Sequence, residues 1–212
     1  MDILLSRRAS LILAAGLAGF VAIQRGGARA ATAPAGFATL DEKNQPLRDD
    51  FNRDVGHVRL LLLMDPICPT CLRGLADIDR DLFSKLPRNT TLRTYVVHEP
   101  VIGGTANNIA GAASLAHAPV RHYWNPSGSF GRVAGSAFDL HHDGRPVYAW
   151  DVWTIYGPDA VWSAGPPPRP RVLMHQLPAL AGDPRFPHLD SKKFAGETLA
   201  LLASHSKKGA AA

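Results

Sequence analysis

The chain has 212 residues, a length typical of one domain. Hydrophobic residues make up 46% of it and charged residues 19%, which supports a buried core and excludes a chain disordered by composition. The formal charge is +5, but the first 30 residues hold four arginines and one aspartate, which leaves 19 basic and 17 acidic residues in the rest. This near balance excludes an electrostatic footprint for DNA or RNA, so no nucleic-acid partner is predicted.

The amino terminus has the three-part layout of a secretory signal. The pair Arg7-Arg8 supplies the charge, Leu11–Ile23 is an uncharged apolar run, and Ala28-Arg29-Ala30 offers small residues around a peptidase site. The apolar run is too short for a bilayer span of about 20 residues, although an uncleaved anchor stays an alternative. The paired arginines resemble a twin-arginine (Tat) signal, with the general secretory route still open. A bacterial periplasmic, oxidising location is therefore predicted.

Beyond residue 46 the apolar pattern alternates between strands and helices. Val58–Met64 is a near-continuous apolar run, typical of a strand buried on both faces. Apolar residues recur every three or four positions over 72–86, which indicates an amphipathic helix. Further strands are predicted over residues 90–97, 120–124 and 151–156, the last with a hairpin return over 160–163. Further helices are predicted over residues 47–55, 105–117, 127–140 and 192–204.

This order predicts one α/β domain behind an export signal. The expected organisation is a cleavable signal over residues 1–30, a flexible leader over 31–46, the α/β domain over 47–190, and a C-terminal helix and tail over 191–212.

The two cysteines of the chain, Cys68 and Cys71, lie between the predicted buried strand and the amphipathic helix. The first turn of a helix presents unpaired N–H groups and the positive end of the dipole, and both favour a thiolate at Cys68. Cys68 is therefore expected to be the more exposed and reactive thiol, while Cys71 can close a small disulfide with it. Pro69 suits the first helical turn, where its missing N–H costs nothing. Such a pair can exchange disulfides with a substrate.

Two other uses of the cysteine pair stay open. A closed zinc site needs four ligands, and a second cysteine pair is absent from the sequence. A static structural disulfide across so short a loop stabilises little, because the effect grows with loop length. The position of the pair in a strand-to-helix turn favours the redox interpretation.

The buried strand, the segment Cys68-Pro69-Thr70-Cys71 with its helix, and the late hairpin resemble the thioredoxin-like superfamily over about half of the chain. The resemblance implies a central mixed sheet flanked by helices, here with a C-terminal helical extension. It also implies a thiol–disulfide oxidoreductase in which Cys68 attacks and Cys71 resolves. Protein thiols or disulfides would be the partners, a membrane electron donor is a further candidate, and no organic cofactor is implied. Pro69 looks more like the glutaredoxin and periplasmic disulfide-oxidase branches than thioredoxin.

The chain departs from the superfamily pattern at two positions. Asp151, preceded by Trp150, occupies the position where a cis-proline usually faces the cysteines. A carboxylate there opposes a thiolate, accepts a proton from the resolving thiol, or serves as a metal ligand. Thioredoxin also keeps a buried acid in the strand before the cysteines, and Leu62 stands at that position. Asp65 and Asp151 are the candidate replacements, and Trp150 is a candidate for the substrate groove.

Two further hypotheses compete with the oxidoreductase. In the first, Cys68 and Cys71 bind a soft metal such as copper or mercury, with Asp151 or His175 as further ligands. A half-buried structural histidine is the alternative interpretation of His175. In the second, the protein is a non-catalytic thioredoxin-like module.

Overall fold

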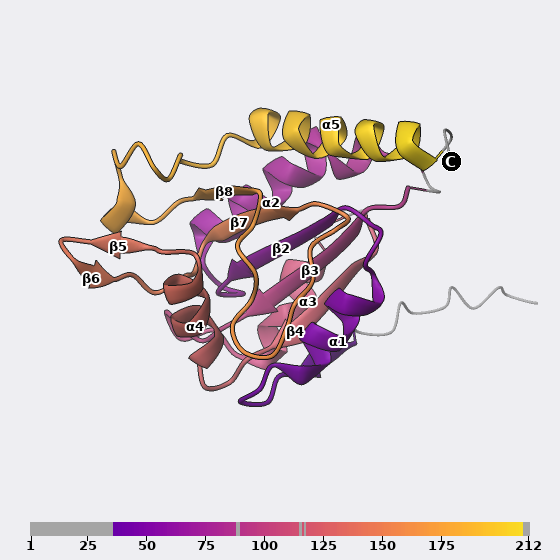
Figure 1. Cartoon of the computed structure of the whole chain (residues 1–212). Helices are drawn as coiled ribbons and strands as arrows, with labels where there is room; N and C mark the ends of the chain where they lie inside the picture. The colour runs from indigo at the N-terminus through magenta and orange to yellow at the C-terminus, as the bar shows by residue number, and fades with distance from the viewer. Residues whose placement is uncertain (1–35, 88–89, 115, 117, 210–212) are drawn as a thin grey trace, which may run out of the picture. The chain divides into compact units, whose positions relative to one another are not determined.

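Six strands form one mixed sheet, flanked on both faces by helices (Figure 1). The computed structural model describes residues 36–87, 90–114, 116 and 118–209. In sheet order the strands are β1 (Phe37–Thr39), β4 (Val120–Trp124), β3 (Arg93–His98), β2 (Arg59–Met64), β7 (Val152–Tyr156) and β8 (Val172–His175).

Strand β2 lies at the centre of the sheet, parallel to β3 and antiparallel to β7. All six of its residues are buried. Because side chains alternate along a strand, Leu61 and Leu63 face one core cluster, while Leu60 and Leu62 face the other. The near-continuous apolar run is therefore the mark of a strand with core on both sides.

The two core clusters are closed by different helices (Figure 1). Helices α1 (Gln45–Arg53) and α4 (Ser129–Ala137) pack on one face through Phe51 and Phe130. Helices α2 (Pro69–Asp81) and α5 (Ser191–Gly209) pack on the other through Leu75 and Phe194. The shorter helices are η1 (Phe83–Lys85), η2 (Ala106–Asn108), α3 (Ile109–Ala113) and η3 (Pro178–Leu180).

The predicted fold class is confirmed. The chain is α/β, with a central mixed sheet flanked by helices and a C-terminal helix. The predicted signal over residues 1–30, and the leader as far as residue 35, lie outside the described residues.

The predicted return strand over residues 160–163 is wrong, because the chain leaves the sheet after Tyr156. The side chain of Asn52 accepts from the Trp162 N–H and donates to the Trp162 carbonyl, both at 2.8 Å. The Trp162 ring packs edge-on against Phe51, with centroids 5.7 Å apart. Helix α1 thus captures this segment, and the antiparallel partner of β7 is β8, which follows the proline-rich connector.

Three local features differ from the prediction. Phe37–Thr39, expected within the leader, forms the edge strand β1 beside β4. A two-residue hairpin, β5 (His141–His142) with β6 (Arg145–Pro146), forms where no strand was predicted. The helix predicted over 105–117 begins with a 3-10 turn, because both the N–H and the hydroxyl of Thr105 donate to the side chain of Asn108.

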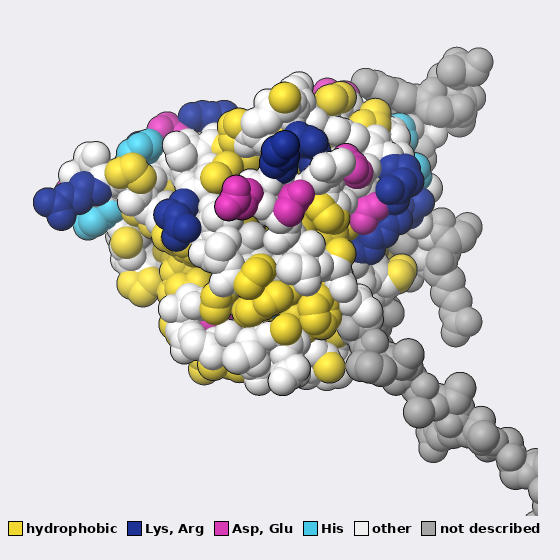
Figure 2. Space-filling model, turned by 90° about the horizontal axis from the view of Figure 1, so that it is seen from below, with side chains coloured by type: hydrophobic (Ala, Val, Ile, Leu, Met, Phe, Trp, Pro, Cys, Tyr) yellow, Lys and Arg dark blue, Asp and Glu magenta, His cyan; other side chains and the backbone are white. Residues whose placement is uncertain are grey.

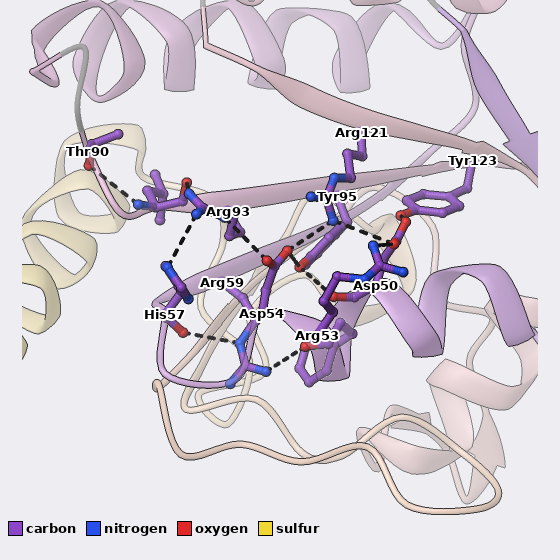
Figure 3. A network of polar contacts seen from close by, with 12 residues as sticks. Asp50, Arg53, Asp54, His57, Arg59, Thr90, Arg93, Tyr95, Arg121 and Tyr123 are labelled. Atoms are coloured by element: carbon purple, nitrogen blue, oxygen red, sulfur yellow. Dashed lines mark hydrogen bonds and ion pairs between the residues drawn. The ribbon is translucent and has the colours of Figure 1, made fainter.

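At the amino ends of the parallel strands, a polar network ties α1 to the sheet (Figure 3). The Asp54 carboxylate accepts from the Tyr95 hydroxyl at 2.6 Å and from Arg121 at 3.0 Å. Arg59, fully buried, donates to four backbone carbonyls at 2.8–3.1 Å, namely those of Phe51, His57, Gly157 and Ala160. Its guanidinium holds α1 and the turn after β7 together.

Candidate active site

The cysteine pair lies at the edge of the sheet where the parallel strands end. The carboxyl end of β2 and the amino end of β7 meet there, because the two strands are antiparallel and Leu63 pairs with Val152. Residues just after β2 and just before β7 are therefore neighbours in space. This topology brings Asp151 to the cysteines across 80 residues of sequence.

Asp65, the first residue after β2, is fully buried and organises the turn before the cysteines. One carboxylate oxygen accepts from the Ile67 N–H at 2.9 Å. The other accepts from the N–H groups of Ile102 (2.8 Å) and Gly104 (3.2 Å), in the loop after β3. A Cβ at residue 104 would lie 2.2 Å from this carboxylate, which explains the glycine. Asp65 therefore fixes the backbone on either side of the site rather than facing the sulfur atoms.

Cys68 is the N-cap of α2, in the extended conformation usual for that position. Its sulfur accepts from the Cys71 N–H at 3.3 Å and lies 3.0 Å from the Thr70 hydroxyl oxygen. Pro69 occupies the first helical turn, as the sequence predicts. Cys68 is more exposed than Cys71, as expected, but only marginally: the residue is 2% exposed, because its side chain packs into the core cluster that α2 covers.

Cys71 lies in the first turn of α2 and is fully buried. Both cysteines are free thiols in this structure. Burial, and next the negative charge of Asp151, raise the pKa of the Cys71 thiol far above its ordinary value. Cys71 is therefore a poor nucleophile until a neighbouring group takes its proton.

Asp151 faces both cysteines from the loop before β7. Cys68 Sγ, Cys71 Sγ and one Asp151 carboxylate oxygen all lie within 4.8 Å of one another. Asp151 has φ +50°, a left-handed conformation that aspartate and asparagine tolerate and that proline cannot adopt. No peptide bond among the described residues is cis. The backbone conformation of this loop therefore differs from that of a loop in which a cis-proline faces the cysteines.

The two oxygens of Asp151 have different surroundings. Oδ1 accepts from the indole Nε1 of Trp153 at 3.0 Å and, with the amide of Gln176 oriented to suit its neighbours, from Gln176 at 3.0 Å. Oδ2 is buried without a well-aligned hydrogen-bond partner among the described residues. Burial raises the pKa of the Asp151 carboxyl. One oxygen is thus held in place, and the other lacks an aligned donor, although the Thr70 and Cys71 side chains lie close to the carboxylate.

Two other residues singled out from the sequence have different surroundings. Trp150 is half-buried and packs against both core clusters, beside Asp151. His175 is buried, its Nδ1 accepts from the Leu177 N–H at 2.9 Å, and its Nε2 donates to the Phe186 carbonyl at 2.9 Å. Because both ring nitrogens are occupied, the geometry supports the structural interpretation of His175.

Sequence reasoning missed three buried titratable groups: His98 at the end of β3, Glu99 just after it, and His122 in the neighbouring strand β4. His98 Nε2 lies 2.9 Å from His122 Nδ1, and burial lowers the pKa values of these histidines to about 3 and about 4. Glu99 accepts from the Gly131 N–H at 2.8 Å, and burial raises its pKa to about 7. The available signal was their position at the carboxyl end of a predicted parallel strand.

Among the described residues, no second group of three or more metal-ligating side chains lies within such distances. Among the described residues, no helix is both long and apolar enough to cross a membrane. Hydrophobic side chains gather near the middle of the face shown in Figure 2. A hollow of about 450 Å³, lined in part by Val133, Lys43 and Pro166, includes none of the residues around the cysteines.

Comparison with known proteins gives limited information. No protein-family model and no curated protein matches the chain. Among solved structures, the chain is similar to a secreted disulfide oxidoreductase of Mycobacterium tuberculosis that is homologous to E. coli DsbE. The two are 12% identical, the match covers 69% of this chain and 83% of that one, and the TM-score is 0.42. Similarity at this level carries no function across, so the function has to follow from the geometry of the cysteine site.

Proposed function

We propose that the protein is a thiol–disulfide oxidoreductase acting on protein substrates in the bacterial periplasm. The observation that carries the proposal is the placement of Cys68 at the N-cap of α2, with the Cys71 N–H and the Thr70 hydroxyl directed at its sulfur. A helix N-terminus favours negative charge, so the attacking sulfur lies where a thiolate is best stabilised.

In the first step the Cys68 thiolate attacks one sulfur of a substrate disulfide. The new Cys68–substrate disulfide forms as the substrate S–S bond breaks, and the second substrate sulfur leaves as a thiolate. The N–H of Cys71 and the hydroxyl of Thr70, at 3.3 and 3.0 Å from the Cys68 sulfur, hold that sulfur in position.

In the second step Cys71 resolves the mixed disulfide. Its thiol gives its proton to the Asp151 carboxylate, one oxygen of which lies within 4.8 Å of the Cys71 sulfur. The thiolate then attacks the Cys68 sulfur, forms the Cys68–Cys71 disulfide and releases the substrate sulfur that was bonded to Cys68 as a thiolate. The substrate disulfide is reduced and the cysteine pair oxidised. The same steps in reverse oxidise a substrate dithiol.

Replacement of the resolving cysteine tests this proposal. Cys71→Ser should accumulate mixed disulfides between Cys68 and substrate proteins, visible as reductant-sensitive bands on non-reducing gels. The matched control Cys68→Ser should accumulate none. If Cys71→Ser traps nothing above the level of Cys68→Ser, the oxidoreductase is excluded and a non-catalytic module is favoured.

Export is the second part of the proposal, supported by the three-part signal in residues 1–30. Amino-terminal sequencing of the protein from a bacterial periplasmic fraction should find Ala31 as the first residue. Replacement of Arg7-Arg8 by two lysines should retain the chain in the cytoplasm if the twin-arginine route is used.

A further inference from the structure

We infer that the reduced protein binds one zinc-like divalent cation through Cys68, Cys71 and Asp151. The three ligand atoms, two sulfurs and one carboxylate oxygen, lie within 4.8 Å of one another. All three residues are at most 2% exposed, so their donor atoms converge on a shielded point. The binding does not depend on redox activity, since it needs only the two reduced sulfurs.

The hydrogen bonding around Asp151 suits a cation ligand, because it orients the carboxylate and leaves one oxygen without an aligned partner. Oδ1 is fixed by Trp153 and Gln176, which orients the carboxylate, while Oδ2 is buried without a well-aligned partner. Hydrogen bonds that orient a ligating group are usual around metal ions in proteins. Among the described residues, no arginine or lysine forms an ion pair with Asp151. Three groups that can become anionic thus share a buried space in which no described arginine or lysine pairs with Asp151, which favours a bound cation.

The mixture of donor atoms selects the kind of cation. Two thiolates favour soft and borderline metals, but a carboxylate is a weak partner for Cu⁺. Zn²⁺ accepts both sulfur and carboxylate ligands in a tetrahedral arrangement. Three protein ligands leave a fourth position for water or another ligand. His175 is not that fourth ligand in this arrangement, because both of its ring nitrogens are bonded to the backbone.

Binding is a proton exchange. The cation displaces the protons of the Cys68 and Cys71 thiols, forms two metal–sulfur bonds and one bond to Asp151, and releases the displaced protons to solvent. Affinity should therefore rise with pH, and the disulfide form should bind no ion, because its sulfurs are no longer thiolates.

The test is a titration of the reduced full chain with Zn²⁺ against a chromophoric chelator, and with Cd²⁺ for its thiolate charge-transfer absorbance. One ion per chain and a Cd²⁺ absorbance that vanishes on oxidation are expected. Asp151→Asn should weaken Zn²⁺ binding at least about 10-fold, the smallest loss typical when a group around a metal is removed. Asparagine can accept from Trp153 and tolerates the positive φ, so the fold is preserved. Asp143→Asn, at an 88% exposed side chain, is the matched control and should bind like the wild type.

Several results would overturn the inference. These are the absence of stoichiometric Zn²⁺ binding by the reduced chain, wild-type affinity in Asp151→Asn, and wild-type affinity in Cys71→Ser. Mixed-disulfide trapping by Cys71→Ser, carried out with the chelator EDTA present, reports on the redox function separately. Failure of one assay therefore does not decide the other.

Discussion

One carboxylate oxygen of Asp151 lies within 4.8 Å of the Cys71 sulfur, and both residues are buried. Burial raises the pKa of each group, and the charge of Asp151 raises that of Cys71 further. The two groups therefore oppose each other's ionisation, and a proton released by one is readily held by the other. This pairing distinguishes the site from one in which a proline faces the cysteines.

The first prediction is that Asp151→Asn slows resolution. Loss of the proton acceptor should slow the attack of Cys71 on the mixed disulfide by about 10²-fold or more, the lower limit for a positioned general base. Attack by Cys68 should change much less, because its sulfur is held by the Cys71 N–H and Thr70. Rapid-quench analysis of a single turnover separates the two steps. Equal slowing of both steps would assign Asp151 a purely structural role.

The same variant gives a prediction for stability. A carboxyl whose pKa is raised on folding stabilises the fold while it is protonated, below its unfolded value of 3.8, and this contribution is lost as pH rises through the folded pKa. Asp151→Asn stays neutral at every pH. We expect the reduced variant to unfold at a higher urea concentration than the wild type at pH 8, with the difference vanishing in acid. A variant less stable than the wild type at pH 8 would contradict this.

Glu99 should make stability depend on pH near neutrality. Burial raises its pKa from 4.5 to about 7, so its contribution is fully present below pH 4.5 and is lost as pH rises towards 7 and above. Glu99→Gln keeps an oxygen for the Gly131 N–H and removes the charge. At pH 8 the variant should be more stable by up to about 3 kcal/mol, as a shift of this size implies. Urea denaturation at pH 4 and pH 8 measures the stability of the variant relative to the wild type. An equal stability difference at the two pH values would refute the raised pKa of Glu99.

Asp65 should prove a structural acid, in contrast to Asp151. Asp65→Asn places an NH₂ group where a carboxylate oxygen now accepts from the N–H groups of Ile102 and Gly104 or from that of Ile67. A donor facing donors leaves buried groups unsatisfied, at a cost of about 1–3 kcal/mol. The loss should appear in urea denaturation at pH 7. Stability equal to the wild type would show that the turn does not depend on this carboxylate.

Arg59 should be one of the most sensitive positions outside the site. Arg59→Lys cannot reach all four carbonyls that the guanidinium bonds, so at least one buried carbonyl loses its partner, and a loss of about 2–4 kcal/mol is expected. Arg53→Ala is the control, because its side chain is 63% exposed and its ion pair with Asp50 is on the surface (Figure 3). That variant should change stability by less than about 1 kcal/mol. Similar losses of stability for the two variants would argue against a role of Arg59 in holding α1 and the turn after β7 together.

Local patterns predicted the elements that build the site. The apolar run of β2, the amphipathic spacing of α2 and the β-branched pattern of β7 each contain their own signal, so the strand–cysteine–helix unit was predictable. The conformation of residues 160–163 was not predictable in this way, because it depends on the contact between Asn52 and Trp162, which are 110 residues apart. β1 was missed because its three residues are exposed and depend on pairing with β4.

The candidate site also combines features that could be predicted from the sequence with features that could not. The placement of Asp151 beside the cysteines was implied by the resemblance to the thioredoxin-like superfamily, and the structure has it there. The burial of Cys68, the hydrogen-bonded state of His175 and the raised pKa of Glu99 come from neighbours distant in sequence. No local pattern specifies such tertiary surroundings.

The most direct test of the account is the reduction potential of the Cys68–Cys71 pair in the full chain, measured by equilibration with glutathione buffers that contain EDTA. The account predicts a reversible two-electron couple between about −270 and −120 mV, the range of thioredoxin-like oxidoreductases. The value would also assign the direction, since a pair near the upper end oxidises substrates and one near the lower end reduces them. A pair that cannot be reduced, or that forms no intramolecular disulfide on oxidation, would contradict it.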